Sequence, residues 1–110
     1  MTTRLHGDVI VIDLQVNPDT ERELLDLVRA LLAEGHRKFV VDLSGLRWLD
    51  SAGLGGVAGA YTAAVRHGGA LVLASPPPAI RILLDQTKLS TIIAVHGSEP
   101  EAIASFNGRG

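Results

Sequence analysis

Cysteine is absent from this 110-residue chain, and aromatic residues make up only 4% of it. The lack of cysteine excludes a disulfide scaffold, a thiolate metal site and a cysteine nucleophile. With so few aromatic side chains, the core must be built from Leu, Ile, Val and Ala. Hydrophobic residues nevertheless account for 46% of the chain and charged residues for 20%. A packed core is therefore expected, and intrinsic disorder is not.

Blocks of like charge and long apolar runs are also missing. The 10 Lys and Arg residues nearly balance the 12 Asp and Glu residues, which argues against a nucleic-acid partner. The apolar runs Val9–Val16 and Ala70–Ala74 are much shorter than the roughly 20 residues that span a bilayer. Residues Met1–His6 contain no apolar stretch of the secretory type. We therefore expect a soluble cytoplasmic protein without membrane insertion.

No linker, repeat or low-complexity segment divides the chain. Its length is that of one domain, and the only proline cluster, Pro76–Pro78, is three residues long and lies between two patterned segments. We expect one domain over residues 1–110.

Hydrophobic patterning predicts strands that alternate with helices. The expected strands are residues 2–6, 9–14, 39–43, 70–74 and 92–95. The expected helices start near residue 19, at 51, at 77–78 and after 98. This alternation predicts an α/β fold with a mostly parallel sheet that begins with an antiparallel hairpin.

Several residues mark the expected helix ends. Asn17 or Asp19 can cap the first helix, and Gly35 can end it. Ser98 and Glu101 have the spacing of a capping box before the last helix. In the helix that starts at residue 51, the apolar side chains expected on one side are Leu54, Val57, Ala58, Tyr61 and Val65.

The most unusual segment, residues 42–56, leaves an expected strand and enters an expected helix. In open α/β sheets, ligands bind outside the carboxyl ends of the strands, which is where this segment falls. Gly53-x-Gly55 fits a dinucleotide site poorly, because it lies too far from the strand and no acid follows about 20 residues later. Ser51 fits a hydrolase poorly, because it lacks the preceding glycine of Gly-x-Ser-x-Gly.

Other chemistry finds no support in the sequence. Lys38 and Lys88 do not follow a glycine, as the lysine of a phosphate-binding loop would. The histidines lack the spacing of metal ligands; they are His6, His36, His67 and His96. We expect no enzyme, no catalytic residue, no cofactor and no metal site.

Glycines crowd the helix that starts at residue 51. Asp50 or Ser51 can cap this helix, but capping does not explain the four glycines inside it, which are Gly53, Gly55, Gly56 and Gly59. Each costs about 1 kcal/mol relative to Ala in a helix interior. They indicate a close approach, either to the sheet beneath or to a partner above.

At these residues the sequence resembles the STAS family (sulfate transporter and anti-sigma factor antagonist domains). The likeness is strongest to the free-standing bacterial anti-sigma factor antagonists. Similar to the family's core motif are Asp42-Leu43-Ser44 and Asp50-Ser51-Ala52-Gly53-Leu54-Gly55, and similar to the segment that follows it is Gly68-Gly69-Ala70-Leu71-Val72-Leu73. The resemblance covers Val9 to about Phe106. It implies a four- to five-stranded sheet flanked by about four helices.

The resemblance also implies a partner-switching mechanism. An antagonist of this family binds an anti-sigma factor, which is a serine kinase, and thereby frees the sigma factor. The kinase phosphorylates the serine after the motif Asp, and a PP2C-type phosphatase restores binding. Carried onto this chain, the phosphoacceptor is Ser51, its preceding acid is Asp50, and an acid near the first helix is Asp19. Gly53 and Leu54 would complete the partner-binding segment.

Two departures from the family pattern bear on these roles. Position 52 is Ala, so Ser51 is the only hydroxyl in the motif. The segment before Asp19 lacks the usual glycine, which favours helix capping for Asp19.

Trp48, the only tryptophan, is either a core residue or a partly exposed anchor for a partner, since Trp is enriched at interface hot spots.

A phosphate on Ser51 would act on the partner rather than on the fold. It adds about −1.5 to −2 charges at the first turn of a helix, where free N–H groups favour an anion. A docked partner would have to bury this charge unpaired. Two alternatives lack such a switch: a STAS subunit of another assembly (lipid-transport or stressosome-like), and a small-ligand sensor.

Overall fold

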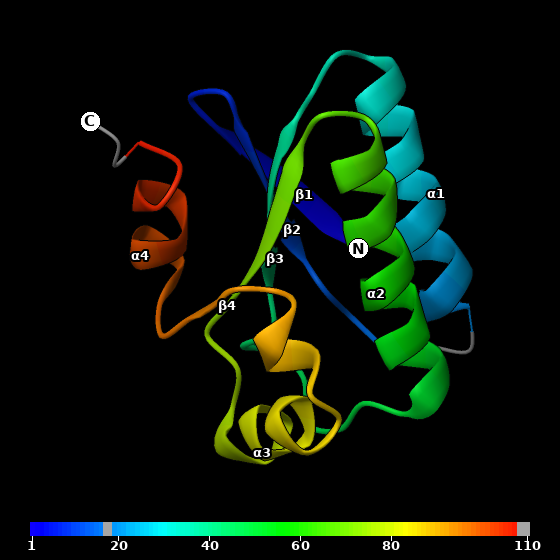
Figure 1. Cartoon of the computed structure of the whole chain (residues 1–110), viewed down its shortest axis with the longest axis vertical. Coiled ribbons are helices and arrows are strands. Elements are labelled where there is room, and N and C mark those ends of the chain that lie inside the picture. The colour runs from blue at the N-terminus through cyan, green and yellow to red at the C-terminus, as the bar shows by residue number, and fades with distance from the viewer. Residues whose placement is uncertain (17–18, 108–110) are drawn as a thin grey trace.

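The computed structural model describes residues 1–16 and 19–107 and contains a five-stranded sheet flanked by helices (Figure 1). The strands are β1 (Thr2–His6), β2 (Val9–Asp13), β3 (Lys38–Asp42), β4 (Ala70–Ala74) and β5 (Val95–His96). The helices are α1 (Thr20–Ala33), α2 (Ser51–Arg66), α3 (Pro78–Gln86) and α4 (Glu99–Ala104), with a 3-10 turn, η1, at Leu89–Thr91. The α/β class, the N-terminal hairpin and the helix number confirm the sequence-based prediction.

The strands lie in chain order, β1-β2-β3-β4-β5. β1 pairs antiparallel with β2, and the other neighbours pair in parallel. Gly7, with φ of 62°, supplies the left-handed conformation that the tight β1–β2 turn requires. The parallel strands are apolar on both faces, as expected for strands covered on both sides.

Two separate apolar layers cover the sheet. On one face, α1, α2 and α3 pack over side chains that include Ile10, Phe39 and Leu71. On the other face, α4 packs with Val9, Val11, Val40, Val72 and Ala74 through Ala102. Figure 1 shows α4 on the side of the sheet opposite α1 and α2. The short helix α4 is therefore the helical cover of the second face.

Two of the four glycines of α2, Gly53 and Gly56, allow a close approach that differs from both of those expected. A Cβ at Gly56 would lie 2.7 Å from the Cα of Glu21 in α1, and a Cβ at Gly53 would lie 2.5 Å from Leu49 Cδ1. The close approach is thus to the neighbouring helix and to the preceding loop, within this chain. A Cβ at Gly59 would find Leu25 at 3.8 Å, an ordinary contact.

Small residues also change which side of α2 is buried. The buried residues are Gly53, Gly56, Val57, Ala60, Ala63 and Ala64. The expected stripe is therefore wrong at Val65, which is 48% exposed. Side-chain size misleads here, because a helix that lies close to α1 buries its small residues and turns larger ones outward.

Two local predictions are also wrong. The expected strand 92–95 is wrong at its first three residues: Ile92 and Ile93 both donate their N–H to the Leu89 carbonyl as η1 ends, and β5 begins only at Val95. Asp19 occupies the N-cap position of α1, but its side chain makes no capping hydrogen bond. Its φ of −104° and ψ of 10° differ from the extended backbone that a capping side chain needs. Asn17, the alternative cap, lies outside the described residues.

The remaining helix ends agree with expectation. Gly35 follows α1 with φ of 101°, and the hydroxyl of Ser98 accepts the N–H of Glu101 at the start of α4. Within residues 1–16 and 19–107, none of the helices is both long enough and apolar enough to span a bilayer.

Candidate functional site around Ser51

The loop between β3 and α2 is fixed at both ends. At its start, Asp42 is buried and its Oδ1 accepts the backbone N–H of Ser44 at 2.8 Å. Further along, Leu46 and Leu49 point into the core. These anchors leave the residues between and after them on the surface, so the loop presents its outward side chains from a fixed backbone.

Asp50, and not Ser51, caps α2; the sequence had left both residues as candidates. Its backbone is extended, and its Oδ1 accepts the N–H of Gly53 at 2.7 Å. Gly53 is buried, and a Cβ there would lie 2.5 Å from Leu49 Cδ1 and 3.3 Å from Asp50 Oδ1. Gly53 thus allows the cap to close, and Leu54, half-buried, packs on the core behind it.

Ser51 is the first residue of α2 and is exposed. Its hydroxyl makes no hydrogen bond to any of the residues that the structure describes, because the cap is provided by Asp50. A group attached to Ser51 Oγ would lie beside the first N–H groups of α2, which favour an anion.

A groove of about 390 Å³ opens beside the start of α2. Its apolar lining comes from Val16, Trp48, Ala52 and Gly53, and the acidic side chains Glu21 and Asp50 complete its lining with Thr20. Trp48 is 57% exposed, so the interpretation as a core residue is wrong. An exposed indole beside an apolar groove is the arrangement found at many protein interfaces.

The sequence-predicted residues do not all meet at this groove. Asp50, Gly53 and Trp48 line it, and Ser51 and Leu54 belong to the same turn of α2. Asp19 lines a neighbouring hollow on α1 instead. Val16, Thr20 and Glu21 also line the groove but could not be predicted from the sequence, because only the approach of α1 to Gly56 brings them beside the motif.

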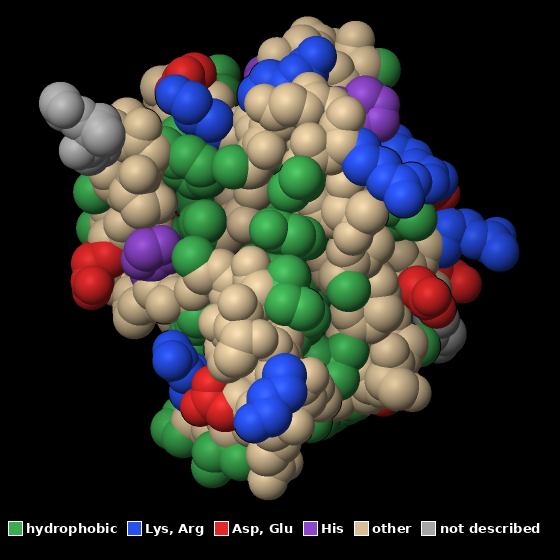
Figure 2. Space-filling view, viewed as in Figure 1, with side chains coloured by type: hydrophobic (Ala, Val, Ile, Leu, Met, Phe, Trp, Pro, Cys, Tyr) green, Lys and Arg blue, Asp and Glu red, His purple; other side chains and the backbone are tan. Residues whose placement is uncertain are grey.

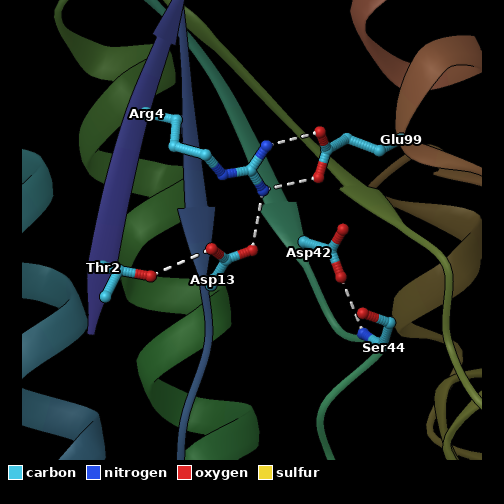
Figure 3. A network of polar contacts seen from close by, with 6 residues as sticks. All are labelled: Thr2, Arg4, Asp13, Asp42, Ser44 and Glu99. Atoms are coloured by element: carbon cyan, nitrogen blue, oxygen red, sulfur yellow. Dashed lines mark hydrogen bonds and ion pairs between the residues drawn. The ribbon is translucent and has the colours of Figure 1, made fainter.

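A second polar cluster lies on the opposite face of the sheet, shown in Figure 3. Arg4 donates to both carboxylate oxygens of Glu99 at 2.7 Å and to Asp13 at 2.9 Å. Asp13, Asp42 and Glu99 place carboxylate oxygens within 4.8 Å of one another. Since the Arg4 guanidinium already pairs with two of these carboxylates, the cluster is an ion-pair network that joins β1 to α4.

The hydrogen bonds from Arg4 are also the main reason for the acidity of Glu99. They lower the pKa of Glu99 from 4.5 to about 2, while partial burial opposes them and Asp42 adds a smaller lowering. The same pairing raises the pKa of Arg4 above its ordinary value. This network lies on the second face of the sheet, where it joins β1 to α4.

The family model described as "Mlab, STAS domain" matches residues 1–94, most of the sequence. The chain belongs to the STAS domain family. The recognition drawn from residues 42–55 is thereby confirmed.

Similar proteins match this chain over most of its length. An anti-sigma F factor antagonist of Paenibacillus polymyxa is 26% identical over 106 residues, which cover 92% of this chain and 89% of the relative. The crystal structure of an anti-sigma factor antagonist from Mycobacterium paratuberculosis superposes with a TM-score of 0.80 at 23% identity, covering 94% and 90% of the two chains. The phosphorylated form of the Bacillus cell fate determinant SpoIIAA gives 0.74 at 19% identity, covering 96% and 97%. These structures show that the STAS fold is common to all of them.

Proposed function

We propose that this chain is an anti-sigma factor antagonist that acts by partner switching. In this proposal, residues 1–110 form one cytoplasmic STAS domain that is not itself an enzyme. The domain binds an anti-sigma factor serine kinase through the groove beside Trp48 and Asp50. Phosphorylation of Ser51 by the kinase releases the complex, and a PP2C-type phosphatase restores binding. The relative from Paenibacillus polymyxa, named an anti-sigma F factor antagonist, supports this assignment.

The observation that carries the proposal is the position of Ser51. Ser51 is exposed, and both of its neighbours in the chain, the capping residue Asp50 and Ala52, line an apolar groove. A phosphate there is tolerated by the helix, since Asp50 takes one N–H of the first turn and others remain available. A partner that covers the groove would enclose the phosphate, which is costly unless the partner offers a cation.

The other serines are less suitable acceptors. Three have hydroxyls engaged in hydrogen bonds, to Asp85, Glu101 and the Ala102 carbonyl respectively; they are Ser90, Ser98 and Ser105. Ser75 is only partly exposed. Ser44 is exposed but lies in the loop and not at a helix start. Ser51 therefore combines exposure with a local field that stabilises a phosphate.

Incubation with the anti-sigma factor kinases of the same organism and ATP, followed by mass mapping of the phosphate, tests the proposal. Ser51→Ala should lose the label, and the matched variant Ser44→Ala should keep it. Equal labelling of Ser51→Ala and the unaltered chain would refute the assignment of the acceptor. If none of the kinases binds or labels the chain, the role of STAS subunit or scaffold in another assembly replaces partner switching.

A further inference from the structure

Three hollows follow one another along the outer surface of α1 and α2. The groove beside Trp48 shares Glu21 with a hollow of about 670 Å³ over α1. That hollow shares Leu25 and Arg29 with a third, of about 290 Å³, between the two helices. Together they form a continuous surface, here called the α1–α2 face. Its principal residues are Glu21, Leu25, Arg29, Trp48, Asp50, Arg66 and His67.

Charge is distributed unequally along the α1–α2 face. The end beside Ser51 is lined by the acids Glu21 and Asp50 and by no base. The opposite end is lined by Arg29, Arg66 and His67 and by no acid. At the right of Figure 2, where α1 lies, Lys, Arg and His side chains gather towards the top, and acidic side chains lie lower, towards the start of α1. Between the two ends, Arg22 and Asp26 balance each other.

The charges at the two ends have a regular spacing. Glu21, Leu25 and Arg29 are four residues apart, so they form one row along α1. An acid and a base thus stand one turn on either side of a partly buried leucine. Neither Arg29 nor Arg66 has an ion pair within the described part of the chain, whereas Arg4, Lys38 and Arg81 each do.

A row of acid, leucine and base is complementary to a second copy of itself that runs in the opposite direction. We propose that the α1–α2 face binds a second copy of this chain about a two-fold axis near Leu25. Glu21 of each copy then faces Arg29 of the other, and the end with Asp50 faces Arg66. An interface of this kind is isologous, so each complementary pair occurs twice. Apolar contact comes from Leu25 and from the small residues of α2 that line the hollows, Ala52 and Gly59.

The proposed dimer covers the end of the face that includes Asp50 and Ala52, the two neighbours of Ser51 in the chain. Self-association and the docking of any other protein at Ser51 would therefore exclude each other. The inference does not depend on the kinase proposed above, because it concerns only the surface of this chain and a second copy of it.

Sedimentation equilibrium of the purified chain tests the proposal. At low salt we expect a monomer–dimer equilibrium, and added salt should shift it towards monomer, because exposed ion pairs are screened. Glu21→Arg and Arg29→Glu should each weaken dimerisation about tenfold, since each places like charges together at two symmetric positions. The double variant restores opposite charges and the original net charge, so it should dimerise as the unaltered chain does.

Arg81→Glu on α3 is the control for the change in charge. It should leave dimerisation unchanged, because α3 lies away from α1 (Figure 1). Circular dichroism of each variant confirms that the fold is retained. A chain that stays monomeric at high concentration and low salt would overturn the proposal. So would dimers that are insensitive to both reversals, or a double variant that dimerises as weakly as the single variants.

Discussion

At the scale of single residues, Asp50 and Ser51 divide two tasks between them. The carboxylate of Asp50 accepts the N–H of Gly53 and so fixes the start of α2. Ser51 is left with an exposed hydroxyl. A change at Ser51 can therefore alter the surface without removing the cap, which is the property a reversible switch requires.

Trp48 is the residue most suited to anchor a partner. Because its side chain is 57% exposed, Trp48→Ala should leave the domain folded. It should weaken binding of the kinase by about 2 kcal/mol, since Trp side chains that become buried in an interface are frequent hot spots. Titration calorimetry measures the loss, with Arg47→Ala as the neighbouring control. An unaltered affinity, together with an unmoved Trp48 fluorescence on binding of a tryptophan-free kinase, would contradict this role.

At the scale of the elements, the packing of α1 against α2 builds the groove. The backbone of α1 at Glu21 lies directly over Gly56. This contact brings Val16 and Glu21 beside Trp48 and Asp50, which are distant in the sequence. The helix pair is therefore responsible both for stability and for the shape of the site.

Two glycines of α2 should respond in opposite ways to the same added methyl group. Gly56→Ala should destabilise the domain by about 1–3 kcal/mol, because its Cβ would lie 2.7 Å from the Glu21 backbone. Gly59→Ala should stabilise it by about 0.5–1 kcal/mol, because its Cβ would be in ordinary contact with Leu25 and the unfolded chain loses freedom. Urea unfolding at low protein concentration measures both. Equal effects of the two substitutions would contradict the packing described here.

The elements themselves were largely predictable from the sequence. Short β-branched runs such as Val9–Ile12, and glycines such as Gly35 at helix ends, depend on local preferences that a sequence displays. The apolar run 92–95 suggested a strand, but hydrogen bonds from Ile92 and Ile93 to the Leu89 carbonyl hold its first residues in a turn. The buried side of α2 was predicted incorrectly, because the close packing of this helix buries small residues in place of large ones.

The candidate site was predictable only in part. Its motif residues, Asp50 and Ser51, are contiguous, so their position at the start of a helix follows from local patterning. The groove needs α1, and no local pattern shows that Glu21 and Val16 lie opposite Trp48. Asp19 was misjudged because capping depends on its backbone angles, which its residue type does not determine.

At the scale of the whole molecule, Arg4 and Glu99 join the two ends of the chain across the sheet (Figure 3). Since α4 covers the valines of the second face, this pair helps to keep that cover in place. The pKa of Glu99 lies near 2 in the folded chain, below its ordinary 4.5. Its contribution to stability is therefore complete above about pH 4.5 and is lost as the pH falls towards 2.

Glu99→Gln should accordingly flatten part of the acid dependence of stability. Above pH 5 the variant should unfold at a lower urea concentration than the unaltered chain, and the difference should shrink as the pH falls from about 4.5 to 2. Glu23→Gln, on the exposed side of α1, is the control. A difference between the unaltered chain and Glu99→Gln that stays constant over this pH range would contradict the ion-pair role of Glu99.

The most direct test of the proposed switch compares two substitutions at Ser51 by titration against the cognate anti-sigma factor kinase. Both variants should remain folded by circular dichroism, since a carboxylate suits the first turn of a helix and Asp50 retains the cap. Ser51→Asp should bind at least about 30-fold more weakly, because burying an unpaired charge in an interface costs about 2–5 kcal/mol. Ser51→Ala should bind nearly as well as the unaltered chain. Equal affinities of the two folded variants would contradict control of the complex by charge at Ser51.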